Sequence, residues 1–514
     1  MVVPSWRRAA LDRCCDWESI GDQLCRKYGA GVEKTRGMNA KLHHPTTPSA
    51  RFAGDMALFA LIGLVAALVR IWGIGDRPLW YDELQSVTHA IQPFSDVAIS
   101  VISFDPHPPL YYQQLHVWMG LFGTGEAWIR LNSVLWSLLT LVPLFLLGRR
   151  LFGTRGALLA VWLFALAPLA VKYAQDVRMY PMQMCLAVTS LYFLERLISD
   201  PPRPVLHAAF FLSLIAAVYC QGAGFLLLAS AGAYALLRLG SGLFTRKHRG
   251  LLVAGLAAGV LTLPWVFLAR DTSLDHLEVP TVAGIGADLY ALVLGSSGGF
   301  QDRWAAGIVV MASIVLCGTV ILPRTRILAS SYIVLPLALI VVLSFLIVPL
   351  WYLRLLSTFL PMCILAVVGI VTAMSDRLGR YGPALQLFAA LCALTLLPQS
   401  LAVSGEERFS QRFNELADYL VATTGPADVI SFENIRDAWG VAWYSADRHI
   451  LRTVEREQAF AIGSGASLLY RPSDEVREQA TVRVLRRGHP AIAPGSPGFD
   501  RLFVVRVDGA EAEG

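Results

Sequence analysis

The sequence is poor in charged residues. Only 16% of its 514 residues are Asp, Glu, Lys or Arg, whereas 55% are hydrophobic. Soluble globular domains usually carry about 25% charged residues, so this composition excludes a chain that is soluble over most of its length. We therefore expect lipid to be the solvent for most of the protein.

The sequence also lacks a cysteine pattern and a secretory signal. Its eight cysteines show no spacing typical of a disulfide framework or a metal site. Residues 1–52 have neither the short apolar core nor the small-residue cleavage site of a signal peptide. We interpret 1–52 as a disordered cytoplasmic N-terminal segment, in which Met38 is an alternative start.

Long apolar runs recur from Ala53 almost to Pro398. A membrane-spanning helix needs about 20 predominantly apolar residues. We therefore predict an all-α polytopic membrane protein with about eleven transmembrane helices. Their ranges are 53–75, 131–148, 156–173, 179–197, 205–219, 221–238, 251–269, 305–322, 328–349, 355–373 and 383–401. The fifth and sixth meet at Tyr219-Cys220-Gln221-Gly222 and could be one broken helix pair.

The net charge of +5 reflects membrane topology rather than nucleic-acid binding. With the N-terminus inside, the cytoplasmic loops carry thirteen basic and two acidic residues, and the opposite loops carry seven basic and twelve acidic residues. The positive-inside rule then fixes the orientation. An odd number of spans leaves the C-terminus on the outer side, which is periplasmic in a Gram-negative cell.

Three domains follow from this pattern. Residues 53–402 form the transmembrane domain, whose outer segments 76–130 and 270–304 are too long to be simple connectors. After residue 402 the sequence becomes charged and mixed, with a helical pattern at 413–422 and strand patterns at 428–432 and 501–507. Residues 403–514 are expected to be a small extracytoplasmic α/β domain, and they contain no motif that indicates chemistry.

Two polar constellations lie in the first outer segment. Pro78-Leu79-Trp80-Tyr81-Asp82-Glu83 places two carboxylates among aromatics at a membrane boundary, where acids are costly unless solvated, paired or used. Asp105-Pro106-His107-Pro108-Pro109-Leu110-Tyr111-Tyr112 is stiffened by prolines and positions His107, Tyr111 and Tyr112. The alternatives are interfacial aromatics beside solvated acids, and a rigid helix entry.

Two further constellations lie in other predicted outer loops. Lys172-Tyr173-Ala174-Gln175-Asp176-Val177-Arg178-Met179-Tyr180 concentrates charge in a short loop. Trp351-Tyr352-Leu353-Arg354 places an arginine on the outer side, against the positive-inside trend. A local ion pair and snorkelling to lipid phosphate are the alternative explanations.

All four constellations fall on one face of the predicted topology. Together they supply carboxylates, cations and aromatics, which are the groups needed to transfer a sugar from a phosphate leaving group to a hydroxyl. The carboxylates are Asp82, Glu83 and Asp176, and the cations are Lys172, Arg178 and Arg354.

The order of these motifs resembles the bacterial members of the C-type glycosyltransferase superfamily. It is similar to glycosyltransferase family 39, which includes protein O-mannosyltransferases, and to rhizobial galacturonosyltransferase-like proteins. The motifs are Trp80 to Glu83, His107 to Tyr112, Arg130-Leu131 before a helix ending Leu147-Gly148-Arg149-Arg150-Leu151-Phe152-Gly153, and Gln175 to Tyr180. The chain departs from the family at Tyr219-Cys220-Gln221 and Arg354-Leu355.

The resemblance implies a bacterial inner-membrane enzyme that takes a sugar from a polyprenyl-phosphate carrier. It implies that Asp82 is the catalytic centre with Glu83 beside it, and that Asp176 is the second outer acid. Lys172, Arg178, Arg354, His107, Tyr111 and Tyr112 are the candidate substrate-binding residues. No cofactor is assigned, although Glu83 or Asp176 could hold a divalent cation.

We therefore predict inverting sugar transfer to an envelope lipid, polysaccharide or protein, with membrane lipid as a partner and no nucleic acid. A flippase or transporter is the main alternative. Transporters usually place polar groups near the membrane midplane and contain internal repeats, and no repeat is evident here. A non-catalytic glycolipid-binding subunit is the third reading.

Overall fold

The structure is a computed structural model of the chain. It describes residues 48–104, 107–201, 203–222, 224–268, 279–295, 303–321, 323–346, 349–402, 412–423, 428–432, 435–445, 460–461, 467–470, 483–486 and 501–505. Contacts divide the chain into two units, Met1–Ala53 and Gly54–Gly514. The N-terminal unit contributes the start of helix α2, and the fold below is that of the second unit.

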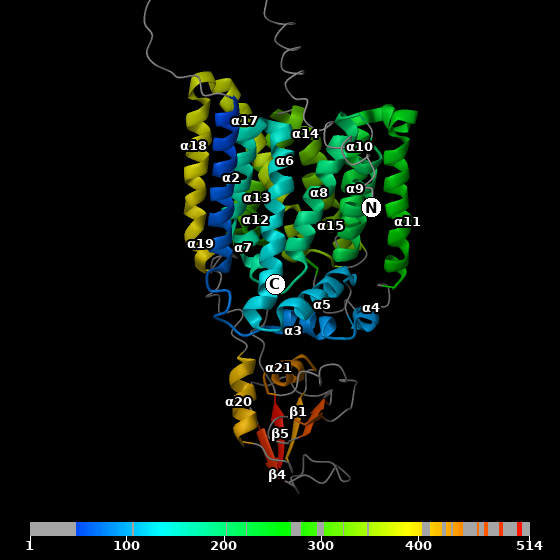
Figure 1. Cartoon of the computed structure of the whole chain (residues 1–514), viewed down its shortest axis with the longest axis vertical. Coiled ribbons are helices and arrows are strands. Elements are labelled where there is room, and N and C mark those ends of the chain that lie inside the picture. The colour runs from blue at the N-terminus through cyan, green and yellow to red at the C-terminus, as the bar shows by residue number, and fades with distance from the viewer. Residues whose placement is uncertain are drawn as a thin grey trace, which may run out of the picture. The chain divides into compact units, whose positions relative to one another are not determined.

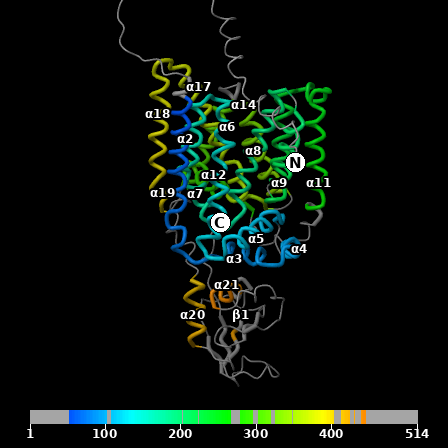
Figure 2. The backbone as a smooth tube through the Cα atoms, viewed as in Figure 1, coloured from blue at the N-terminus to red at the C-terminus, as the bar shows by residue number. Residues whose placement is uncertain are grey.

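Most of the second unit up to residue 402 is a bundle of helices, which Figure 1 shows side by side. The long helices are α2 (Pro48–Ile71), α6 (Glu126–Leu166), α8 (Tyr180–Ser199), α9 (Pro204–Cys220), α10 (Gly224–Leu239), α11 (Arg249–Leu268), α12 (Val282–Leu294), α13 (Trp304–Leu316), α15 (Leu335–Leu346), α17 (Leu360–Leu378) and α18 (Gly382–Ala393). Short helices are α7 (Pro168–Ala174), α14 (Pro323–Ala329), α16 (Leu353–Leu356) and α19 (Leu397–Ala402). Single turns join them at Gly240–Phe244, Arg246–His248, Cys317–Ile321, Ser330–Val334, Ser357–Phe359, Gly379–Tyr381 and Leu394–Leu396. Figure 2 follows the same path as a tube.

The bundle is built for lipid. In the part that the structure describes, five helical stretches are long and apolar enough to cross a membrane, and they are Phe52–Ile71, Glu126–Leu166, Gly224–Phe244, Thr325–Leu346 and Leu353–Ala402. On α2, Leu61, Leu64 and Leu68 are 56%, 56% and 62% exposed, a pattern that fits hydrocarbon as the surrounding solvent. The chain is therefore a multi-pass membrane protein, as predicted, while the number of eleven spans and the orientation stay predictions.

Helix α6 covers two of the predicted spans. Its helical conformation is interrupted at Gly153, whose φ of 75° lies in the left-handed region that favours glycine. Beyond this turn the chain doubles back. The close approach of the two arms shows at Gly148, where a Cβ would lie only 3.1 Å from the Cα of Ala157. The predicted spans 131–148 and 156–173 are thus the two arms of one tight hairpin, and the second arm ends at Leu166 before α7 begins.

The predicted outer segment 76–130 is largely helical. Helices α3 (Tyr81–Ala90), α4 (Phe94–Phe104) and α5 (Leu110–Phe122) lie across one end of the bundle in Figure 1. On α5 the residues Tyr111, Tyr112 and Leu115 are fully buried. This packing gives α3, which carries Asp82 and Glu83, a fixed place against the bundle.

The C-terminal residues contribute helices α20 (Phe413–Thr423) and α21 (Ile435–Ser445) and a five-stranded sheet. Its strands are β1 (Asp428–Phe432), β2 (Phe460–Ala461), β3 (Ser467–Tyr470), β4 (Arg483–Arg486) and β5 (Arg501–Val505), in the order β2-β3-β1-β5-β4. Strand β1 pairs in parallel with β3 and β5, and the two edge strands pair antiparallel. The helix near 413–422 and the strands at 428–432 and from Arg501 are confirmed, whereas a separate domain over 403–514 stays a prediction.

Candidate functional site

The polar segments singled out in the sequence come together in space. Arg354 of α16 contacts Asp82 of α3, and Arg178, which follows α7, contacts the backbone of the same residue. Arg130 of α6 contacts Glu83. Three of the four constellations therefore meet around the first turn of α3.

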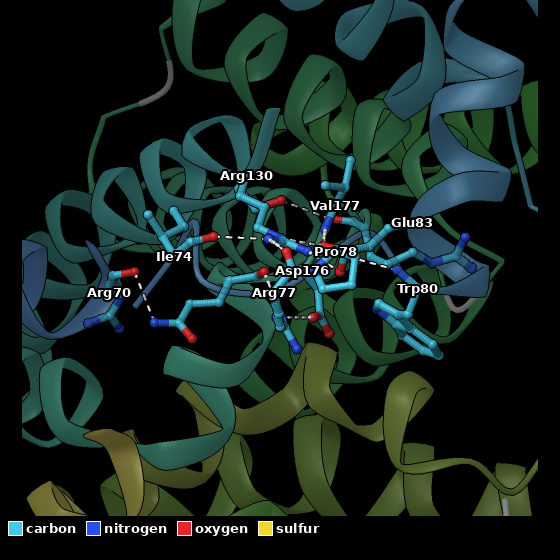
Figure 3. A network of polar contacts seen from close by, with 12 residues as sticks. Arg70, Ile74, Arg77, Pro78, Trp80, Glu83, Arg130, Asp176 and Val177 are labelled. Atoms are coloured by element: carbon cyan, nitrogen blue, oxygen red, sulfur yellow. Dashed lines mark hydrogen bonds and ion pairs between the residues drawn. The ribbon is translucent and has the colours of Figure 1, made fainter. Parts of the chain in front are cut away.

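The centre of the cluster is a buried ion pair between Glu83 and Arg130, drawn in Figure 3. Arg130 Nε donates to Glu83 Oε1 at 2.8 Å and Nη2 donates to Oε2 at 2.7 Å, and both side chains are 0% exposed. The remaining Arg130 donors bind the carbonyls of Ile74, Arg77 and Pro78 at 2.9 to 3.0 Å. One guanidinium thus fixes the chain leading into α3.

Glu83 also accepts two backbone hydrogen bonds. The N–H of Val177 donates to Oε1 at 3.1 Å, and the N–H of Trp80 donates to Oε2 at 3.3 Å, which caps the N-terminus of α3. Burial raises the pKa of Glu83, but the charge and hydrogen bonds of Arg130, the charge of Arg77 and the Val177 N–H together leave that pKa below its ordinary value. Glu83 is therefore an ionised, fully bonded group that joins α3, α6 and the loop before α8.

Asp176 forms a second buried pair beside the first. Arg77 Nη2 donates to Asp176 Oδ1 at 2.8 Å and to the carbonyl of Gln175 at 2.9 Å. Burial raises the pKa of Asp176 above its ordinary value, and the nearby charges of Arg77 and Lys172 oppose that rise. Lys172 is itself only 5% exposed on α7, so its charge acts inside this network.

The pair between Asp82 and Arg354 differs because it lies at the edge of water. Arg354 Nη1 donates to Asp82 Oδ2 at 2.5 Å, and the two side chains are 39% and 12% exposed, respectively. The guanidinium also lies 5.5 Å from the centre of the Trp80 ring, within the range of a cation–π interaction. A carboxylate, a cation and an aromatic ring therefore meet here, and the arginine is the partly exposed member.

Helix geometry separates the two neighbouring carboxylates. Consecutive residues of a helix do not face each other, so Asp82 points toward α16 while Glu83 points toward α6. Arg178, only 3% exposed, supports this arrangement by donating to the Asp82 carbonyl and to Ser86 Oγ, each at 3.2 Å. Arg178 thus holds α3 in place from the side of α8.

The remaining predicted residues lie farther along the first outer segment. Tyr111 and Tyr112 are 0% exposed, and the Tyr112 ring packs edge-on against His89 at 5.2 Å. Both side chains therefore pack in the interior, and their predicted substrate-binding role stays a prediction. His107 is half-buried next to the turn between α9 and α10, because a Cβ at Gly222 would lie 3.9 Å from its Nδ1.

The two acids that could hold a divalent cation are already paired with arginines. Both Glu83 oxygens accept from Arg130, and Asp176 Oδ1 accepts from Arg77. Among the described residues no group of three His, Cys, Asp or Glu side chains has the arrangement of a metal site. This donor set does not fit a divalent cation, so no step of the chemistry below uses one.

Sequence reasoning did not assign a role to several residues of this site. Arg130 was placed only at a helix entry, and Arg77 only in the loop charge count. Trp351 Nε1 donates to Asp288 Oδ2 of α12 at 2.9 Å, which ties the segment before Arg354 to the second outer segment. The signal that the sequence offers is an arginine next to an apolar run, Arg77 after 53–75 and Arg130 before 131–148, because a buried arginine needs a partner.

Two solved structures share this fold, which is that of C-type glycosyltransferases. The apo crystal structure of ArnT from Cupriavidus metallidurans matches with a TM-score of 0.55 and 17% identity, over 77% of this chain and 84% of that one. The structure of the same protein bound to undecaprenyl phosphate matches with a TM-score of 0.50 and 17% identity, over 76% and 84%. At this level of identity the likeness establishes the fold alone.

Part of the chain also matches a known protein family. Residues 106–267 match the model of a family described as dolichyl-phosphate-mannose-protein mannosyltransferase. The match confirms the predicted resemblance and the predicted enzyme class, a glycosyltransferase. No curated protein matches the chain.

Proposed function

We propose that this protein is an inverting glycosyltransferase that moves a sugar from a polyprenyl-phosphate carrier to a hydroxyl of an envelope lipid, polysaccharide or protein. The observation that carries the proposal is the ion pair of Asp82 with the partly exposed Arg354, next to the fully buried pair of Glu83 and Arg130. The reaction takes place at the outer face of the bacterial inner membrane, in the orientation expected from loop charges. The ArnT structure bound to undecaprenyl phosphate supports a donor of this class.

Asp82 and Arg354, together called the rim of the site, have complementary roles in this proposal. The donor phosphate binds the Arg354 guanidinium, because a cation with several N–H donors suits phosphate oxygens. When Arg354 turns to the phosphate, its 2.5 Å hydrogen bond to Asp82 Oδ2 breaks, and this oxygen can accept a hydrogen bond from the acceptor hydroxyl. Trp80, stacked near Arg354, offers an aromatic face to the sugar.

The bond changes are those of a single displacement. The acceptor oxygen attacks the anomeric carbon while Asp82 takes its proton, which is general base catalysis. The bond between the anomeric carbon and the phosphate oxygen breaks, and its electron pair stays on the carrier phosphate. Arg354 stabilises the charge that develops there. Attack from the side opposite the phosphate inverts the anomeric configuration.

The buried network positions these two groups. Glu83, Arg130, Arg77, Asp176 and Arg178 are each at most 8% exposed. Their hydrogen bonds fix α3 against the loop before α8, so that Asp82 faces Arg354. Glu83 and Asp176 thus act as positioning residues in this proposal, and Lys172 adds positive charge beside them.

An assay in proteoliposomes tests the proposal. The purified protein is reconstituted with a polyprenyl-phospho-sugar that carries a radiolabelled sugar. Transfer of the label from the lipid and release of the carrier phosphate are followed with and without an envelope extract as acceptor. We expect carrier-phosphate release that depends on the acceptor. Movement of the intact sugar-lipid across the bilayer without bond cleavage would instead support a flippase.

A further inference from the structure

The C-terminal helices contact the segment that carries Asp82. The N–H of Leu79 donates a hydrogen bond of 2.8 Å to Tyr444 Oη of α21. The Tyr444 hydroxyl in turn donates to the carboxylate of Glu126, the first residue of α6. Tyr444 therefore bridges the chain entering α3 and the start of α6.

Tyr444 and Arg130 both bind the backbone of the segment that leads into α3. Arg130 lies one turn after Glu126 and binds the carbonyls of Arg77 and Pro78 at 2.9 and 3.0 Å. Tyr444 takes the N–H of the next residue, Leu79, which is 0% exposed. The peptide group between Pro78 and Leu79 is thus held at its carbonyl by Arg130 and at its N–H by Tyr444.

Helices α20 and α21 form a firm support for Tyr444. Phe413 of α20 is 1% exposed and packs against Gly440 of α21, where a Cβ would lie only 2.4 Å from its ring. The same Phe413 ring lies 5.3 Å from the ring of Tyr81, edge-on. The helix pair therefore contacts the residues on both sides of Trp80, and Asp82 follows directly.

We infer that Tyr444 is a positioning residue for Asp82, and that the C-terminal segment takes part in the reaction through it. The inference rests on the proposed role of Asp82. Leu79 directly precedes Trp80, the N-cap of α3, and Asp82 lies in the first turn of that helix. Loss of the bridge lets this turn shift relative to Arg354, while Arg354 itself is untouched.

The test compares Tyr444→Phe with Tyr419→Phe in the full-length protein. Tyr419 lies on α20 and is 49% exposed, so it is a matched control for loss of a tyrosine hydroxyl. We expect Tyr444→Phe to lower kcat by roughly 10- to 100-fold, because small displacements of reacting groups cost rates of that order. The KM for the lipid donor should stay within about twofold of wild type, and Tyr419→Phe should match wild type in both constants.

Two further variants complete the test. Glu126→Gln keeps an oxygen that accepts from Tyr444 and should retain most of the activity, whereas Glu126→Ala should lower kcat as Tyr444→Phe does. If Tyr444→Phe does not accumulate as folded protein, the pair at Glu126 provides the same measurement from the other end of the bridge. A melting temperature for each variant separates a shift of Asp82 from general unfolding.

The possible results are distinct. An unchanged kcat in Tyr444→Phe and Glu126→Ala overturns the inference, as does a loss confined to donor KM. Asp82→Asn is measured in parallel, and full activity in that variant removes Asp82 as the base. Absence of acceptor-dependent sugar transfer in the wild-type protein overturns the proposed function itself. Loss of activity in Asp82→Asn with normal Tyr444→Phe leaves the proposed function in place and removes only the role of Tyr444.

Discussion

Asp82 and Glu83 are adjacent in sequence and lie in two very different regions of the protein. Glu83 belongs to the interior, where it accepts from Arg130 Nε, Arg130 Nη2, Trp80 N and Val177 N. Asp82 belongs to the rim, where it pairs with an arginine whose side chain is 39% exposed. An acidic residue at a membrane boundary is therefore not enough to identify a reacting group, because the four hydrogen bonds of Glu83 leave it no capacity for a substrate.

The two regions should therefore respond differently to substitution. Removing one member of a buried ion pair leaves an uncompensated charge and destabilises the protein. Removing Arg354, whose side chain is 39% exposed, should cost less stability, because water can replace part of its interaction with Asp82. Stability should thus report on the interior, and activity on the rim.

The largest expected effect is that of Glu83→Ala. The substitution leaves Arg130 buried without its partner and should cost about 3 to 5 kcal/mol of folding free energy. The measurement is thermal or denaturant unfolding in detergent, together with the yield of folded protein. Replacing both members, as in Glu83→Gln with Arg130→Met, should recover part of the loss, and wild-type stability in Glu83→Ala would erase the distinction between the two regions.

Arg354→Ala probes the rim. Loss of a charged hydrogen bond to the donor phosphate should raise the KM for the lipid donor roughly 10- to 100-fold, the range expected for one charge-assisted contact. The melting temperature should stay close to that of wild type. Arg354→Lys keeps the charge, and its KM for the lipid donor should lie between those of wild type and Arg354→Ala. An unchanged donor affinity in Arg354→Ala would contradict the assignment of phosphate binding to Arg354.

Trp351→Phe tests the support behind the rim. It removes the 2.9 Å hydrogen bond to Asp288 and keeps an aromatic ring at a residue that is 7% exposed. We expect a loss of about 1 kcal/mol in stability and a few-fold rise in donor KM, since this bond ties the segment before Arg354 to α12. Trp304→Phe, at a residue 40% exposed, is the control and should change neither quantity.

Asp176→Asn breaks the buried pair with Arg77 and should lower stability as other interior substitutions do. The smallest expected effect is the change that this substitution makes in how stability depends on pH. Burial raises the pKa of Asp176 in the folded protein, so the folded state binds more protons than the unfolded state above about pH 4. The contribution of Asp176 to stability therefore falls as pH rises from there through the raised pKa. Melting temperatures across this window should decline less steeply in Asp176→Asn than in wild type, and parallel curves would count against the raised pKa.

Much of the fold could be predicted because lipid imposes a strong pattern. Apolar runs of sufficient length marked the bundle, and strand patterning marked Asp428–Phe432. The tight hairpin in α6 could not be predicted from the apolar pattern, because the turn depends on the left-handed conformation of a single residue, Gly153, in a stretch with several arginines. Loop charges placed the four polar constellations on one face, and the contacts among three of them fit that prediction.

The division of labour within the site could not be predicted. The sequence shows Asp82 beside Glu83, but which carboxylate turns inward depends on Arg130, which is 47 residues away from Glu83. The bridge from Tyr444 to Glu126 joins residues 318 positions apart, beyond the reach of any local pattern. Such pairings are decided by how the helices pack, and only the structure gives that packing.

The proposed reaction depends on removal of the acceptor proton by Asp82, which the turnover of an Asp82→Asn variant tests. Purified Asp82→Asn is reconstituted with saturating polyprenyl-phospho-sugar and acceptor, and its turnover, donor binding and melting temperature are compared with those of wild type. The account predicts a turnover lowered by roughly 100-fold or more, with donor binding retained and the fold intact. Turnover near that of wild type in a folded Asp82→Asn protein would contradict it.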